Sequence, residues 1–203
     1  MALSVRYLVE KRGFSGAIAK TISSTLMLNR LAKKYDLELY ETPVGFDVIA
    51  ELMLSSDILL GGEESGGISI KGHIPEGDGI LMGLLLMEIV AEANIPLSEL
   101  IADLQREVGP TCYKRDDIRL KNFVSKAEMV KRLVDRSPEK IAGEAVVKVD
   151  SYDGVKYHLA DDSWLLIRPS GTEPVLRVYA EAGHEKAVDE LLRTGRALSD
   201  MER

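Results

Sequence analysis

The chain has 203 residues, 45% of them apolar, which is enough to bury the core of one large domain or of two small ones. Its single cysteine, Cys112, excludes a disulfide framework and a thiolate zinc site, and favours a reducing, cytoplasmic location. The net charge of -7 comes from residues 1–105, which hold 8 Lys and Arg against 15 Asp and Glu, and this acidic front half argues against nucleic acid or an anionic membrane as a partner. We also expect no export signal and no membrane span, because residues 1–9 form too short an apolar run and no later stretch reaches about 18 apolar residues.

The first hundred residues alternate between helical and strand patterns. Apolar spacing predicts a helix over the first dozen residues and helices beginning at Ser24 and over residues 46–54, and short apolar runs predict strands at residues 16–20, 37–40 and 57–60. Strands that alternate with helices of about ten residues predict βαβ units and a mostly parallel sheet.

Two more helices are predicted before the end of this first part. Residues 80–93 are apolar almost all round, so we expect this helix to be buried, with Asp78 as its N-cap. Residues 97–108 form a helix with one apolar face, which the following Gly-Pro pair stops. The sequence therefore predicts a first domain over residues 1–108, an α/β domain with a mostly parallel sheet and flanking helices.

The second half has a different pattern. Strands are predicted at residues 113–120, 145–149, 155–159, 164–167 and 175–180, and Asp153-Gly154 is a strong hairpin signal. Ser125 and Glu128 form a capping box ahead of one helix, and residues 187–201 form a closing amphipathic helix. Helices on one face of about four antiparallel strands predict a smaller α+β domain with an antiparallel sheet over residues 109–203.

Two strands of this second domain are joined by a turn with the composition of an anion site. Residues 168–174 read Arg-Pro-Ser-Gly-Thr-Glu-Pro. A guanidinium, two hydroxyls and the backbone N–H groups around a glycine are the donors that phosphate oxygens accept. The alternative is a tight surface turn whose residues are chosen only for their backbone angles. The candidate phosphate ligands are Arg168, Ser170, Gly171, Thr172 and, on the outgoing strand, Arg177.

A second candidate loop follows a predicted strand of the first domain. Residues 61–67 read Gly-Gly-Glu-Glu-Ser-Gly-Gly, and open α/β sheets bind ligands at the carboxyl ends of their strands. Only Glu63, Glu64 and Ser65 offer side chains there, and carboxylates and hydroxyls suit the vicinal hydroxyls of a sugar. The alternative is a flexible acidic turn. His73 is a possible pocket residue nearby, although a lone histidine beside a glycine-rich loop more often serves as a hydrogen-bonding scaffold.

Both loops resemble those of the α-D-phosphohexomutases, the phosphoglucomutase and phosphomannomutase family. The segments Thr-Pro-Val-Gly-Phe at 42–46 and Lys-Gly-His-Ile-Pro at 71–75 are also similar to this family. The resemblance covers nearly the whole chain, but only the third and fourth of the family's four domains. It implies that Glu63 and Ser65 bind the sugar hydroxyls, that Lys20 faces the substrate and that Glu64 is less directly involved. Asp47 stands where family members often have lysine.

The resemblance also implies a reaction that needs groups outside this chain. Phosphohexomutases interconvert hexose 1-phosphate and hexose 6-phosphate through a phosphoserine and a hexose 1,6-bisphosphate intermediate, with Mg²⁺ bound by aspartates. Neither the serine motif nor the aspartate loop occurs here, so we expect no catalytic residue and no metal ligand in this chain.

The chain therefore looks like the substrate-recognition half of an intramolecular phosphotransferase, inactive by itself. Its expected partners are a hexose phosphate and the missing N-terminal domains. One alternative is a non-catalytic phosphosugar-binding module that complements a separate chain carrying the first two domains, and another is a degraded remnant. The loop at 63–67 looks more like phosphoglucomutase and bifunctional members than like phosphoglucosamine mutases, and the choice between glucose and mannose stays open.

Overall fold

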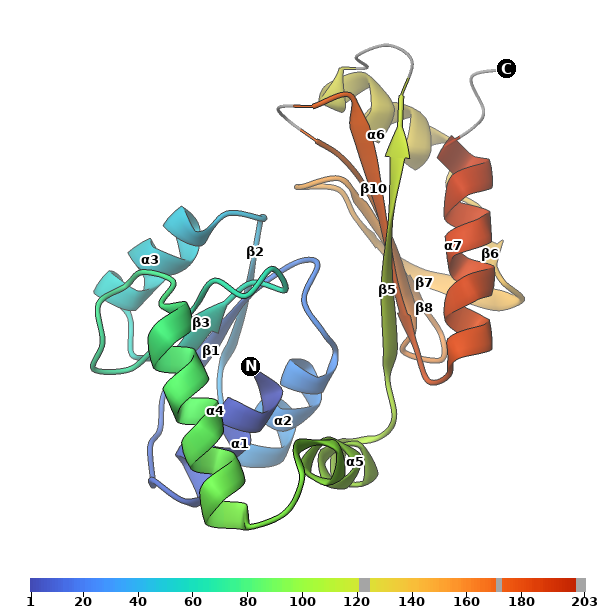
Figure 1. Cartoon of the computed structure of the whole chain (residues 1–203). Helices are drawn as coiled ribbons and strands as arrows, with labels where there is room; N and C mark the ends of the chain where they lie inside the picture. Colours follow the sequence, from blue (N-terminus) through green and yellow to red (C-terminus); the bar gives the residue numbers. More distant parts are fainter. Residues whose placement is uncertain (121–124, 171–172, 200–203) are drawn as a thin grey trace. The chain divides into compact units, whose positions relative to one another are not determined.

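The computed structural model describes residues 1–120, 125–170 and 173–199 (Figure 1). The chain forms two compact units, Met1–Pro110 and Thr111–Arg203. Among the described residues no single helix is long and apolar enough to cross a membrane, although the consecutive helices Gly79–Ala93 and Leu97–Val108, which meet at 84°, pass the same test of length and composition as a bent pair.

The first unit is built around a four-stranded sheet in the order β2-β1-β3-β4. β1 is parallel to β2 and to β3, and β4 is antiparallel to β3. The chain passes from β1 to β2 and from β2 to β3 through helices, which is what parallel pairing requires. The mostly parallel α/β prediction is confirmed. The strands are β1 (Ala17–Thr21), β2 (Leu39–Thr42), β3 (Ile58–Gly62) and β4 (Ile68–Ile70), and the crossover helices are α2 (Met27–Tyr35) and α3 (Phe46–Ser55).

Helices cover both faces of this sheet. Helix α3 packs on one face, where Ile49 meets the alanines of β1 and Ile58 of β3. The other face is covered by α1 (Ala2–Glu10), α2 and α5 (Leu97–Val108), which share a buried core with β1 and β3. Because both faces are covered, the central strands β1 and β3 are buried along their whole length.

The prediction that the apolar helix after residue 78 is buried all round is wrong. Helix α4 (Gly79–Ala93) packs through Leu85 and Ile89 against α1 and α5 instead of lying between layers. Its opposite side leaves Ile80, Leu84 and Met87 exposed by 80%, 58% and 68%. These three positions are spaced i, i+4, i+7 and so form one stripe on the helix.

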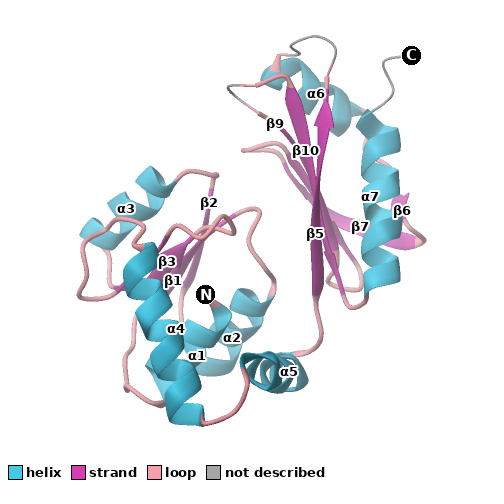
Figure 2. Ribbon diagram, viewed as in Figure 1, coloured by secondary structure: helices cyan, strands magenta, loops and turns pink. Residues whose placement is uncertain are grey.

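The second unit is a six-stranded antiparallel sheet in the order β5-β10-β9-β8-β7-β6. Two helices pack on one face of it, and their buried side chains share a core with strands β8, β9 and β10 (Figure 2). The α+β prediction is confirmed. The elements are β5 (Cys112–Arg119), α6 (Lys126–Asp135), β6 (Lys140–Ile141), β7 (Glu144–Asp150), β8 (Val155–Leu159), β9 (Trp164–Pro169), β10 (Val175–Ala182) and α7 (Glu185–Ser199).

Smaller differences from the sequence predictions concern short elements and caps. Strand β4 was not predicted, since three residues between glycine-rich turns carry no usable periodicity, and β3 extends over the first two glycines of the loop. The second sheet has six strands instead of about four, because all five predicted strand ranges join it together with the unpredicted two-residue β6. Ser125 is the N-cap of α6, as expected, but its side chain makes no cap hydrogen bond.

Candidate functional site

The glutamate loop of the first unit is a tight turn that closes directly after β3. The N–H of Glu63 donates to the carbonyl of Gly67 at 2.9 Å, and the N–H of Gly66 donates to the carbonyl of Glu63 at 3.2 Å. Two of the glycines serve packing rather than flexibility. A Cβ at Gly61 would lie 2.5 Å from Ile49 of α3, and one at Gly62 would lie 3.0 Å from Ile68 of β4. The loop is therefore held by close contact on both sides of the strand.

The two carboxylates of this loop are tied to the ends of two other strands. Glu64 Oε2 accepts a hydrogen bond from Ser23 Oγ at 2.7 Å and a longer one from Thr21 Oγ at 3.4 Å, and both donors lie just beyond β1 or at its end. Glu63 Oε1 accepts from the backbone N–H of Gly45 at 3.0 Å, after β2. Ser65 is exposed at the tip of the turn. The loop therefore gathers the carboxyl ends of β1, β2 and β3, the edge at which open α/β sheets bind ligands.

Lys20 lies at the same edge of the sheet but is fully buried. Its ammonium Nζ is 3.3 Å from Glu41 Oε2 on β2, the residue opposite it in the parallel register. Nζ also donates to the carbonyl oxygens of Ser24 and Thr25 at 3.3 and 3.4 Å. A buried ammonium needs such partners, and these contacts fix Lys20 between β1 and β2.

His73 contacts the cap of α4. Its Nε2 lies 3.0 Å from Asp78 Oδ2, while Asp78 Oδ1 accepts from the N–H groups of Ile80 and Leu81. The prediction that Asp78 is the N-cap is confirmed. The N–H of Leu81, together with His73 and the N–H of Ile80, holds the pKa of the Asp78 carboxyl below its ordinary value. This contact is of the scaffold kind, in which the ring orients a capping carboxylate.

In the second unit, two arginines stand side by side at the predicted phosphate turn. Arg168 on β9 and Arg177 on β10 are direct partners in the antiparallel register, so their side chains leave the same face of the sheet. The Nε atom of Arg177 is buried without a hydrogen-bond partner among the described residues, and its NH2 lies 3.7 Å from Glu173. Ser170 follows at the end of β9, is 5% exposed, and its Oγ accepts from the N–H of Glu173 at 3.3 Å. Gly171 and Thr172 lie outside the described residues.

Arg168 is itself held by a carboxylate from the neighbouring hairpin. Asp153, 3% exposed at its side chain, lies between β7 and β8, and its Oδ2 accepts from Arg168 Nε at 2.9 Å. Sequence reasoning found Asp153 only as a turn signal. The side-chain role could not be read from the sequence, because 15 residues separate the two partners.

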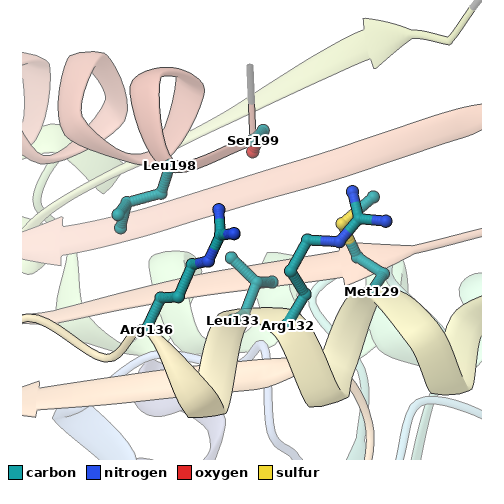
Figure 3. Close-up of a pocket in the computed structure, with 6 residues that line it drawn as sticks. All are labelled: Met129, Arg132, Leu133, Arg136, Leu198 and Ser199. Atoms are coloured by element: carbon teal, nitrogen blue, oxygen red, sulfur yellow. The ribbon is translucent and has the colours of Figure 1, made fainter. Parts of the chain in front are cut away.

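A separate cavity of about 10 Å³ lies between α6 and the end of α7 (Figure 3). In Figure 3 the side chains of Arg132 and Arg136 extend from the same side of α6, beside Leu198 of α7. A cavity of this volume holds one water molecule at most, so it is not a substrate site. Its lining residues are Met129, Arg132, Leu133, Arg136, Leu198 and Ser199.

The described part of the chain also lacks a cluster suited to a metal ion. No group of three or more His, Cys, Asp and Glu side chains converges there as a metal site would need. The carboxylates at the two loops are engaged by a backbone amide, hydroxyls and arginine instead. These residues therefore do not fit the Mg²⁺ ion that the resemblance implies.

The chain thus combines an α/β unit, which has an acidic loop at the carboxyl edge of its sheet, with an α+β unit that carries two paired arginines on β9 and β10. Residues 1–108 match the family model for phosphoglucomutase/phosphomannomutase, alpha/beta/alpha domain III, and residues 129–194 match the model for the C-terminal domain. The chain therefore belongs to the phosphoglucomutase/phosphomannomutase family, a group of isomerases of carbohydrate metabolism.

Individual relatives agree with this assignment. A protein named phosphoglucomutase/phosphomannomutase from Thermococcus kodakarensis is 31% identical over 89% of this chain, and a phosphoglucosamine mutase from Methanocaldococcus jannaschii is 34% identical over 96%. A solved structure described as a phosphomannomutase, from Thermus thermophilus, has a TM-score of 0.78 and 32% identity over 98% of this chain. The chain spans 37% and 41% of the length of the first two relatives and 40% of the third.

Proposed function

We propose that this chain is the substrate-recognition part of a phosphohexomutase, which interconverts hexose 1-phosphate and hexose 6-phosphate. The observation that carries the proposal is the paired placement of Arg168 and Arg177 on adjacent strands at a turn, with the Nε of Arg177 left without a partner among the described residues. Two guanidinium groups on one face suit the oxygens of a phosphate group.

In this proposal the second unit binds the phosphate that does not react. Arg168 and Arg177 provide charge and donors, and Ser170, Gly171 and Thr172 provide hydroxyl and backbone donors. The first unit binds the sugar through Glu63 and Ser65, whose oxygens accept from or donate to ring hydroxyls. We assign supporting roles to Glu64, whose Oε2 accepts from Ser23, to Lys20, which is buried beside Glu41, and to His73, whose Nε2 contacts the cap residue Asp78.

The chemistry itself is assigned to domains that precede this part in the longer relatives. There a phosphoserine transfers its phosphate to the free hydroxyl of the hexose phosphate, which gives the hexose 1,6-bisphosphate. The bisphosphate then reverses its orientation, and its other phosphate returns to the serine. Since positioning and charge stabilisation account for most of the rate in phosphoryl transfer, residues that only hold the substrate still control the reaction.

A complementation assay tests this proposal. The purified chain would be mixed with a separately produced chain that carries the first two domains of the Thermus thermophilus relative, and conversion of glucose 1-phosphate to glucose 6-phosphate would be followed. We expect activity only in the mixture, and at least a tenfold loss with Arg168→Ala. Turnover by the purified chain alone, free of host enzyme, would contradict the assignment of the chemistry to other domains.

The same mixture identifies the substrate. The relatives carry the names phosphoglucomutase/phosphomannomutase and phosphoglucosamine mutase, so the glucose, mannose and glucosamine phosphates are the substrates to compare. We propose glucose and mannose phosphates, because the acidic loop over residues 63–67 resembles that of phosphoglucomutase and bifunctional members more than that of phosphoglucosamine mutases, which tend to differ at the positions of Glu64 and Gly67. A preference for glucosamine 1-phosphate above tenfold in kcat/KM would contradict this choice.

A further inference from the structure

The turn between β7 and β8 packs directly on the strand that carries Arg168. Asp153 in this turn accepts from Arg168 Nε through Oδ2, and its Oδ1 lies 2.5 Å from Nζ of Lys126 on α6. Gly154 has φ +89, and a Cβ there would lie 2.6 Å from the carbonyl oxygen of Ile167 and 3.0 Å from Cα of Arg168. The hairpin therefore contacts both the backbone and the side chain of this one arginine.

The hydrogen bond from Arg168 to Asp153 uses Nε and not a terminal nitrogen of the guanidinium. This choice of donor matters for anion binding. A guanidinium is planar, and its two terminal nitrogens present a fork of donors to a phosphate. A hydrogen bond to Nε fixes the plane of this fork without occupying both terminal groups. The Arg168 side chain is 13% exposed, so it is not fully enclosed by protein.

The Asp153 carboxylate is attracted by Arg168 and Lys126, but its charge opposes the binding of a phosphate beside Arg168. The Asp153 carboxylate lies 2.9 Å from Nε of Arg168, the proposed phosphate-binding residue. Its negative charge therefore repels a phosphate and lowers the positive potential of the site. Lys126 offsets part of this charge on the other carboxylate oxygen. Asp153 therefore has two opposing effects on phosphate binding. It fixes the orientation of the Arg168 guanidinium, which favours binding, and it lowers the positive potential, which opposes binding. We expect the first effect to be the larger one.

We propose that Asp153 is a positioning residue for phosphate recognition, which holds the Arg168 guanidinium in the orientation that receives a phosphate group. The inference rests on the proposed function of the turn at 168–174. Asp153 touches no substrate in this account and acts only through Arg168.

The two effects of Asp153 predict opposite results when its charge is removed. If its charge dominates, Asp153→Asn tightens phosphate binding. If its positioning dominates, Asp153→Asn weakens it, and we expect about a tenfold loss, the lower end of what removing an orienting partner costs a metal ligand. Asparagine before glycine is a favoured turn residue, so the variant keeps the hairpin.

The experiment is an NMR titration of the ¹⁵N-labelled full chain with inorganic phosphate and with glucose 1-phosphate. The resonance of the Arg168 Nε–H group reports its orientation directly, and a thermal melt reports stability. The matched control is Asp150→Asn, in the same hairpin, where the carboxylate pairs with Lys148 and His158 instead of with Arg168. We expect Asp153→Asn to shift the Arg168 Nε–H resonance and to lower the affinity for both ligands about tenfold. We expect Asp150→Asn to change neither the resonance nor the affinities.

Each outcome decides a separate claim. Equal or tighter phosphate binding by folded Asp153→Asn overturns the positioning role and leaves the proposed phosphate site standing. No phosphate binding by the wild-type chain at millimolar ligand overturns the proposed preformed site and this role with it. If Asp153→Asn does not fold by circular dichroism, Asp153→Ser, which keeps a short acceptor oxygen, takes its place with the same expected loss.

Discussion

The carboxylate of Glu63 accepts a hydrogen bond from the backbone N–H of Gly45 at 3.0 Å, which joins the loop after β3 to the first residue before α3. Gly45 has φ +140, a backbone conformation that residues with a side chain rarely adopt. The position of Glu63, the proposed sugar ligand, therefore depends on a glycine in another loop.

Gly45→Ala tests this dependence. The substitution strains the backbone and displaces the N–H that holds Glu63, so we expect about a tenfold weaker affinity for glucose 1-phosphate, measured by NMR titration. The matched control is Gly72→Ala. Gly72 has φ +85 and open space around it, so this substitution strains a neighbouring turn without touching Glu63. Equal losses of affinity in the two variants would mean that Gly45 acts only through stability.

A Gly→Ala substitution should change the free energy of unfolding in opposite directions in helices α4 and α7. Gly83 is exposed inside α4 with nothing within 4 Å of a new Cβ, so Gly83→Ala should raise the free energy of unfolding by about 1 kcal/mol. At Gly195 of α7 a Cβ would lie 2.5 Å from Val178 and 3.0 Å from Leu165, so Gly195→Ala should lower it by about 1 to 3 kcal/mol. Urea denaturation followed by Trp164 fluorescence and circular dichroism separates the effects on the two units. A stabilised Gly195→Ala variant would show that α7 does not lie as close to the sheet as described.

The cap of α4 should make stability depend on pH in the acid range. The folded protein holds the pKa of Asp78 below its ordinary value of 3.8, so the ionised carboxyl contributes stability that is fully present above that value and is lost as the pH falls through the lowered pKa. Asp78→Asn keeps a good N-cap without the charge. We expect the melting temperatures of the wild type and of this variant to differ near neutral pH, and the difference to shrink as the pH falls below 3.8. A constant difference over that range would mean that the Asp78 charge is not stabilising.

Ser23 should contribute to the stability of the acidic loop. It is fully buried and donates to Glu64 at 2.7 Å, and hydrogen bonds to charged groups contribute about 1.5 to 3 kcal/mol. Ser23→Ala should lower the free energy of unfolding by that amount, whereas Ser55→Ala, which removes an exposed bond to the carbonyl of Glu51 within α3, should change it by less than about 1 kcal/mol. Comparable losses in the two variants would contradict the role of Ser23 as an anchor of the loop.

The sequence predicted the elements whose residues carry their own pattern. The alternation of strands and helices in the first unit and the run of strands in the second were both readable, because periodicity and turn residues are local properties. The two loops were readable for the same reason, since each is contiguous and follows a strand. The glycine and carboxylate residues of one loop, and the arginine of the other, are visible within a short stretch of sequence.

What the sequence did not show depends on contacts between distant residues. An apolar position says that burial is favourable but not what covers it, which is why the exposed stripe of Ile80, Leu84 and Met87 was predicted to be buried. Strand β4 exists because Ile68 and Ile70 pair with β3. The hydrogen bonds from Gly45 to Glu63 and from Arg168 to Asp153 join residues 18 and 15 positions apart.

The most direct test of the central claim is a titration of the chain with glucose 1-phosphate by NMR, compared with Arg168→Ala. The matched control is Arg193→Ala, an arginine of α7 that is 71% exposed and lies outside both loops. We predict weak binding in the millimolar range that Arg168→Ala weakens at least tenfold and Arg193→Ala leaves unchanged. Binding of equal strength in the wild type and Arg168→Ala would contradict the assignment of the turn at 168–174 as the phosphate site.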